Sequence, residues 1–146
     1  MGQLADTVLA QGGRVTGVMP EKLVEKEVAH PGLSRLHVVS SMHERKSLMA
    51  DLAEGFIALP GGFGTLDETF EIVTWAQLGY HNKPCGLLNI SGFFNELLAF
   101  LKTATKQRFL KEQHLRMLMV SPEPKMLLDR FESYQAPVVD KWIKAD

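Results

Sequence analysis

Short apolar runs alternate along the chain with longer segments in which apolar residues recur at helical spacing. The runs contain four to six residues, and turn residues or polar positions bound them, as is typical of β-strands. The expected strands are residues 14–19, 36–39, 56–59, 85–90 and 117–120. The longer segments predict helices over residues 2–11, 41–54, 65–78, 93–104 and 122–134.

Three further segments are polar. Residues 21–32 predict a loop with a helical turn, and residues 105–114 have room for a short helix. The residues from Ala136 onward predict a tail or a short docking helix. Strands that alternate with helices form βαβ units, so the pattern predicts an α/β fold whose parallel sheet carries helices on both faces.

Ligands of such sheets bind beyond the carboxyl ends of the strands. This rule predicts that a ligand binds at the segments that follow Val39, Leu59 and Val120. The chain opens on a predicted helix, whereas a doubly wound domain normally begins with a strand and a glycine-rich turn.

Composition narrows the function classes. The 146 residues predict a single domain over residues 1–146, and the net charge of −1 shows no basic excess that would suggest a nucleic-acid partner. The sequence has neither a signal peptide nor an apolar run long enough to span a membrane, so we expect a cytoplasmic protein without a membrane partner. The single cysteine, Cys85, fits a reducing compartment, and the scattered histidines predict no metal site.

The segment from Pro60 to Glu68 (PGGFGTLDE) follows a predicted buried strand and opens a predicted helix. Three glycines within four positions allow a ligand to approach the backbone closely. Amide groups at the start of a helix favour an anion, so this turn predicts a phosphate site. The alternative is a tight strand-to-helix turn. The segment is not a P-loop, because no Lys-Ser/Thr pair follows the glycines.

Carboxylates follow this turn. Thr65 and Glu68 match a capping box, in which Glu68 would serve only to cap its helix. At about 100° per residue, Glu68, Glu71 and Trp75 lie opposite an apolar stripe. That stripe consists of Leu66, Phe70 and Val73. A large ring beside two carboxylates indicates a face covered by a ligand or by a second subunit, where a carboxylate stabilises a cation or activates water.

A second polar cluster, Met42 to Lys46 (MHERK), starts the preceding predicted helix. Ser41 and Glu44 match a capping box. Arg45 shares a helical stripe with apolar residues, and a cation in the first turns opposes the helix dipole, so Arg45 is expected to meet an anion. The stripe contains Met42, Leu48, Met49 and Leu52. The alternative is an Arg45 that pairs with a structural carboxylate or extends to solvent.

Together, these two motifs resemble the LONELY GUY family of cytokinin-activating phosphoribohydrolases. The similarity continues through residues 75–79 and 83–84 and covers nearly the whole chain. The resemblance implies a Rossmann-like fold and hydrolysis of the N-glycosidic bond of a nucleoside 5′-monophosphate to a free base and ribose 5-phosphate. It implies no cofactor, and a homodimer whose site lies near the subunit interface.

The resemblance also assigns roles to residues. Arg45 and Glu68 match the family's catalytic pair. The implied substrate-binding residues are Glu27, Lys46, Gly61, Gly62, Phe63, Gly64, Thr65, Leu66, Asp67, Glu71 and Thr74. Family members carry an upstream strand–helix segment that ends in a glycine-rich pattern, and Met1-Gly2 resembles the end of that pattern. We therefore expect a Rossmann-like sheet that lacks its N-terminal strand–helix segment.

Two other functions remain open at this point. One is a non-catalytic nucleotide-binding protein of the same fold, which would bind a nucleotide without releasing its base. The other is an amino-acid decarboxylase, an older label for this family. Decarboxylation normally needs a cofactor such as pyridoxal phosphate on a lysine, and the lysine at the motif, Lys46, lies beside Arg45 in the expected phosphate site.

Overall fold

The structure is a computed structural model that describes residues 2–24 and 30–137. It is an α/β protein whose strands pair in parallel, which confirms the fold class predicted from the pattern. The chain forms two compact units, residues 1–53 and 54–146, and each is described by itself. Glu27 lies outside the described residues. Within the described part, no helix is long and apolar enough to cross a membrane.

The first unit contains a two-stranded parallel sheet. Its elements are α1 (Gly2–Ala10), β1 (Thr16–Pro20), α2 (Glu21–Val24), β2 (Arg35–Val39) and α3 (Met42–Leu52). Thr16 pairs with Arg35 at one end of the ladder, and Pro20 pairs with Val39 at the other. Pro20 is the last residue of β1, an edge strand, where a proline without an amide hydrogen is tolerated.

The second unit contains a three-stranded parallel sheet in the order β3-β4-β5. Its elements are β3 (Phe56–Ala58), α4 (Phe63–Gln77), β4 (Cys85–Leu88), the 3-10 turn η1 (Ile90–Gly92), α5 (Asn95–Lys106), α6 (Glu112–Leu115), β5 (Leu118–Ser121) and α7 (Pro124–Glu132). All four residues of the central strand β4 are buried, as expected for a strand covered on both faces.

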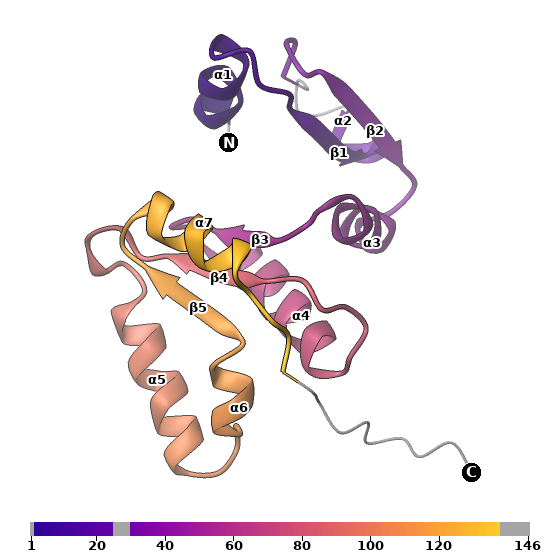
Figure 1. Ribbon diagram of the computed structural model, residues 1–146. Helices are drawn as coiled ribbons and strands as arrows, with labels where there is room; N and C mark the ends of the chain where they lie inside the picture. The colour runs from indigo at the N-terminus through magenta and orange to yellow at the C-terminus, as the bar shows by residue number, and fades with distance from the viewer. Residues whose placement is uncertain (1, 25–29, 138–146) are drawn as a thin grey trace. The chain divides into compact units, whose positions relative to one another are not determined.

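Helices cover both faces of this sheet, as Figure 1 shows with α7 on one side and α5 and α6 on the other. Successive side chains of a strand point to opposite faces, so Leu87 and Leu88 enter different clusters. Leu87 joins a cluster with Phe94 and Leu101, against which α4 also packs. Leu88 joins a cluster with Leu127 of α7. The helices on both faces that the sequence predicts are therefore present in the second unit.

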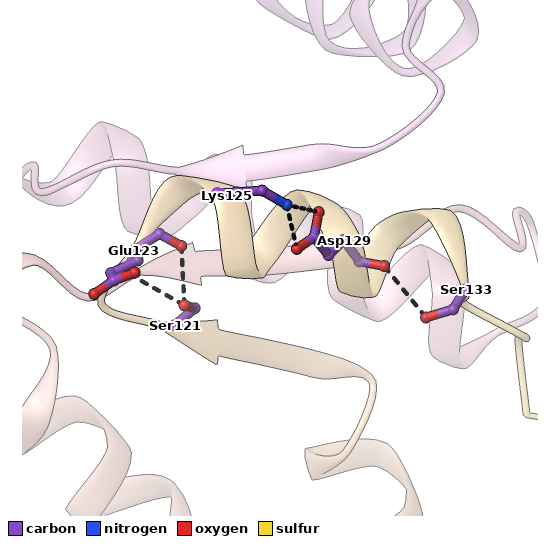
Figure 2. A network of polar contacts seen from close by, with 5 residues as sticks. All are labelled: Ser121, Glu123, Lys125, Asp129 and Ser133. Atoms are coloured by element: carbon purple, nitrogen blue, oxygen red, sulfur yellow. Dashed lines mark hydrogen bonds and ion pairs between the residues drawn. The ribbon is translucent and has the colours of Figure 1, made fainter.

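The junction between β5 and α7 is a tight polar turn (Figure 2). The buried hydroxyl of Ser121 donates to the carbonyl of Glu123 at 2.9 Å and accepts from the amide of Glu123 at 3.1 Å. Lys125 and Asp129 form an ion pair one helical turn apart at 2.8 Å, and the Ser133 hydroxyl donates to the Asp129 carbonyl at 3.3 Å. The segment after Val120, one of the expected ligand positions, thus closes a turn with its own polar groups.

The observed elements lie where the sequence predicts them, with ends that shift by a few residues. The largest shift that concerns the candidate site is at α4, which begins at Phe63 rather than at residue 65. The described strands are distributed over two parallel sheets, one in each unit.

Candidate active site

The glycine-rich turn joins β3 to α4 within the second unit. Gly62, which has no side chain, occupies the N-cap position of α4. The first intrahelical bond runs from the amide of Leu66 to the carbonyl of Gly62 at 3.1 Å. Helix geometry therefore leaves the amides of Phe63, Gly64 and Thr65 without an acceptor in the helix, at its positive end. These amides are the groups that an anion would bind.

The capping box predicted from Thr65 and Glu68 is wrong. The helix starts two residues earlier than expected, so Thr65 lies inside the first turn and Gly62 takes the cap position. Glu68 therefore lies in the second turn, beyond the amides that a capping carboxylate serves. Glu68 is therefore not placed to cap this helix.

The glycines of the turn differ in their surroundings. A Cβ atom on Gly61 would overlap the hydroxyl of Thr65 and lie 2.9 Å from its Cβ, so Gly61 is needed for packing. A Cβ atom on Gly62 or Gly64 would meet no atom of the described residues within 4 Å. Packing thus explains Gly61 alone, and the open space at Gly62 and Gly64 leaves the backbone accessible to a ligand.

Helix α4 has the two faces that the sequence predicts. Leu66, Phe70 and Val73 pack against the core cluster around Leu87, which confirms the apolar stripe. On the other side, the Glu68, Glu71 and Trp75 side chains are half-buried. The Leu66 side chain thus packs on the core, and its amide is used in the hydrogen bond to Gly62.

The remaining α4 residues of the expected site are more exposed. Phe63 is 94% exposed, and Asp67 is also exposed. Thr74 lies two turns further along, where its hydroxyl donates to the Phe70 carbonyl at 2.7 Å. An apolar cavity of about 120 Å³ borders Thr74 on the side facing α5, α6 and β5. The glycines do not line this cavity, which lies beside the far half of the helix.

In the first unit, Arg45 and Lys46 lie near the start of α3, and both side chains are half-buried. The capping box of Ser41 and Glu44 is confirmed in one half, because the Ser41 hydroxyl accepts from the Glu44 amide at 3.1 Å. The Glu44 carboxylate accepts instead from Ser40, a residue that lies outside the capping-box pattern. These hydrogen bonds to Ser40 lower the pKa of Glu44.

The expected apolar stripe of α3 is only partly buried, since its member Leu48 is half-buried. Met42, Met49 and Leu52 are exposed, and Ala50 is the residue of this helix that is buried. Arg45 therefore does not lie on a closed apolar face. A two-stranded sheet is narrow, and α3 packs mainly on β1 and β2, which explains why much of the helix surface stays open.

The structure places the expected site residues in two groups. Residues 61–71 and Thr74 lie together on the turn and on α4, whereas Arg45 and Lys46 belong to the other unit. Among residues 2–24 and 30–137, no group of three or more His, Cys, Asp or Glu side chains is placed to hold a metal ion.

A glycine-rich turn between a parallel strand and a helix is a feature by which many α/β proteins bind phosphorylated ligands. The sequence profile of the family described as "Possible lysine decarboxylase" matches residues 1–131. The chain belongs to this family, which is the LONELY GUY family that the two motifs resemble.

Curated plant relatives are similar over most of the chain. A protein of Oryza sativa subsp. japonica named probable cytokinin riboside 5′-monophosphate phosphoribohydrolase LOGL6 is 41% identical over 141 residues, which are 97% of this chain and 56% of the relative. Cytokinin riboside 5′-monophosphate phosphoribohydrolase LOG5 of Arabidopsis thaliana is 42% identical over 140 residues, which are 96% of this chain and 61% of the relative. The chain thus spans little more than half the length of these relatives.

Proposed function

We propose that the protein is a phosphoribohydrolase. It would hydrolyse the N-glycosidic bond of a nucleoside 5′-monophosphate, a cytokinin riboside monophosphate or AMP, to a free base and ribose 5-phosphate. Family membership and the printed names of the relatives support this activity. The observation that carries the proposal is the β3–α4 turn, where open amides at a helix start precede the half-buried Glu68.

In this proposal, the amides of Phe63, Gly64 and Thr65 bind the 5′-phosphate. The open backbone at Gly62 and Gly64 supports this role, because a phosphate needs close approach to the amides. Further substrate contacts are proposed from the resemblance. They are Glu27, Lys46, Gly61, Asp67, Glu71 and Thr74. Leu66 would act through its packing on the core, since its amide is bonded to Gly62.

Glu68 and Arg45 are the proposed catalytic residues. Cleavage of a ribosyl–base bond builds positive charge on the sugar, as in glycoside hydrolysis. An ionised Glu68 would stabilise that charge and orient or deprotonate the attacking water. The Arg45 guanidinium would bind the phosphate or the sugar hydroxyls. This mechanism uses the side chains of the protein and requires no cofactor.

We also propose a cytoplasmic homodimer whose interface includes the Trp75 face of α4. Two exposed residues near the end of that helix support the interface, because Leu78 is 52% exposed and Tyr80 is 74% exposed. Apolar surface of this kind favours association with a second subunit. The single free cysteine, Cys85, agrees with a reducing compartment.

The activity is tested by chromatography of the products formed from AMP and from isopentenyladenosine monophosphate. The wild type should release the base, and Glu68→Gln should reduce the rate by at least about 100-fold, as expected for loss of a charge that stabilises the transition state. Glu132→Gln, an exposed carboxylate on α7, is the matched control and should retain the wild-type rate. Nucleotide binding without base release in the wild type would refute the activity and favour a non-catalytic nucleotide-binding protein.

A further inference from the structure

We propose that Ser40, Ser41 and Glu44 form a clamp at the turn between β2 and α3, and that Glu44 is a positioning residue for Arg45. The inference rests on the proposed function, in which Arg45 binds the nucleotide. The clamp is defined by three hydrogen bonds within the first unit.

The clamp closes the turn from both sides. One carboxylate oxygen of Glu44, Oε2, accepts from the Ser40 amide at 2.8 Å and from the Ser40 hydroxyl at 2.7 Å. In return, the Glu44 amide donates to the Ser41 hydroxyl at 3.1 Å. In an ordinary capping box the carboxylate accepts from the amide of the cap residue itself. Here it reaches one residue further back, so it binds the helix to the chain that leaves β2.

The clamp connects a fixed strand to Arg45. Val39, the last residue of β2, is 5% exposed and pairs with Pro20. Ser40 follows it directly, and the Arg45 amide donates to the Ser41 carbonyl at 3.0 Å. Hydrogen bonds at Ser40, Ser41 and Arg45 therefore hold the backbone between the buried strand and the first helical turn. The Arg45 side chain therefore extends from a backbone whose position is fixed.

Charge favours the same arrangement. A cation in the first turns of a helix opposes the helix dipole, whereas a carboxylate there is favourable. The two hydrogen bonds from Ser40 keep the Glu44 pKa below its ordinary value, which favours an ionised carboxylate in the first turn of α3. The negative charge of Glu44 is thus favourable at the helix start while the residue holds the turn.

A simple capping role predicts a different result from a positioning role. A cap stabilises α3 and affects activity only as far as the protein unfolds. A positioning residue affects kcat in folded protein, because a small displacement of a catalytic group lowers the rate by up to about 100-fold. The two roles are separated by measuring kcat, KM and the melting temperature on the same variants.

The variants are Glu44→Ala, Glu44→Gln and the control Asp51→Gly, which loosens the other end of α3. We expect Glu44→Ala to lower kcat for base release from AMP by about 10- to 100-fold with KM within about twofold of the wild type. Glu44→Gln keeps one oxygen that accepts from Ser40 and should recover part of kcat. Asp51→Gly should lower the melting temperature and leave kcat unchanged at temperatures where it is folded.

A double-mutant cycle tests whether Glu44 acts through Arg45. On an Arg45→Ala background, Glu44→Ala should have no further effect on kcat. Effects that simply add would overturn the positioning role, and so would a wild-type kcat in Glu44→Ala. Absence of both base release and AMP binding in the wild type would overturn the proposed function and the positioning role together. Base release by the wild type at the same kcat as by Glu44→Ala would overturn the positioning role alone.

Discussion

Replacement of Gly64 by alanine should have opposite effects on the stability of the protein and on its affinity for a phosphorylated ligand. Gly64 is the second residue of α4, and an added Cβ would meet no atom of the described residues within 4 Å. Glycine in a helix is less favourable than alanine by about 1 kcal/mol, partly because its unfolded chain has more freedom. The fold alone therefore prefers alanine at this position.

We expect Gly64→Ala to stabilise the protein by about 0.5–1 kcal/mol, because the first turn of a helix realises only part of the full propensity difference. For a chain of this size that corresponds to a rise in melting temperature of about 3 °C. A phosphate on the amides of the turn would lie against the added methyl group. AMP affinity should therefore fall by about tenfold, or about 1.4 kcal/mol.

Urea unfolding and calorimetric titration with AMP measure the two effects on the same preparation. Gly61→Ala is the matched control, since its Cβ would overlap Thr65 and overpacking costs about 1–3 kcal/mol. Gly61→Ala should thus lose stability, in contrast to Gly64→Ala. A Gly64→Ala protein that is more stable and binds AMP like the wild type would refute the phosphate interpretation of the turn, and a destabilised one would refute the geometry of the helix start.

Three further predictions concern other parts of the chain. His81 joins α4 to the next strand, as its ring contacts the Ile72 carbonyl at 2.9 Å and accepts from the Lys83 amide at 3.1 Å. Burial lowers the pKa of His81, so its contribution to the unfolding free energy should be complete above the unfolded pKa of about 6.5 and be lost as pH decreases through the folded-state pKa. Urea unfolding at several pH values should show a smaller loss of stability in His81→Gln than in the wild type. An equal loss would contradict the assignment to His81. Arg108 follows the end of α5 with a φ of 66°, a backbone conformation that favours glycine. Arg108→Gly should therefore raise the unfolding free energy by about 1 kcal/mol. A loss of stability would show that the arginine side chain contributes more than its strained backbone costs. Burial raises the pKa of Cys85 to about 12, so a thiol reagent at neutral pH should label it in urea and leave it unlabelled in the folded protein; rapid labelling without urea would contradict its burial.

Hydrophobic spacing predicted the faces of α4 well because packing decides them. Leu66, Phe70 and Val73 lie on the core as expected. The start of the same helix is predicted two residues too late, because Gly64 is a poor helix former and the capping-box pattern of Thr65 and Glu68 places the start after it. The space that the Thr65 side chain takes at the position of a Gly61 Cβ is a three-dimensional feature with no counterpart in the sequence pattern.

The exposed surface of α3 does not follow from the spacing of its apolar residues. Periodicity shows which residues share a helix face, but it does not show how much of that face the neighbouring sheet covers. Met42, Met49 and Leu52 share a stripe and remain exposed beside a two-stranded sheet. Ser40 was missed for a related reason, because the capping-box pattern begins at the cap residue, Ser41, and ignores the residue before it.

The two helices that carry the proposed catalytic residues are held in place by different forces. The start of α4 has a glycine cap, and its position is set by the packing of Leu66 and Phe70 on the core, so it should respond weakly to pH and to salt. The start of α3 has exposed polar contacts around Glu44 and a helix whose buried residue is Ala50. Ionisation strengthens the hydrogen bonds that the Glu44 carboxylate accepts, so the start of α3 should loosen as pH falls through the lowered folded-state pKa of Glu44.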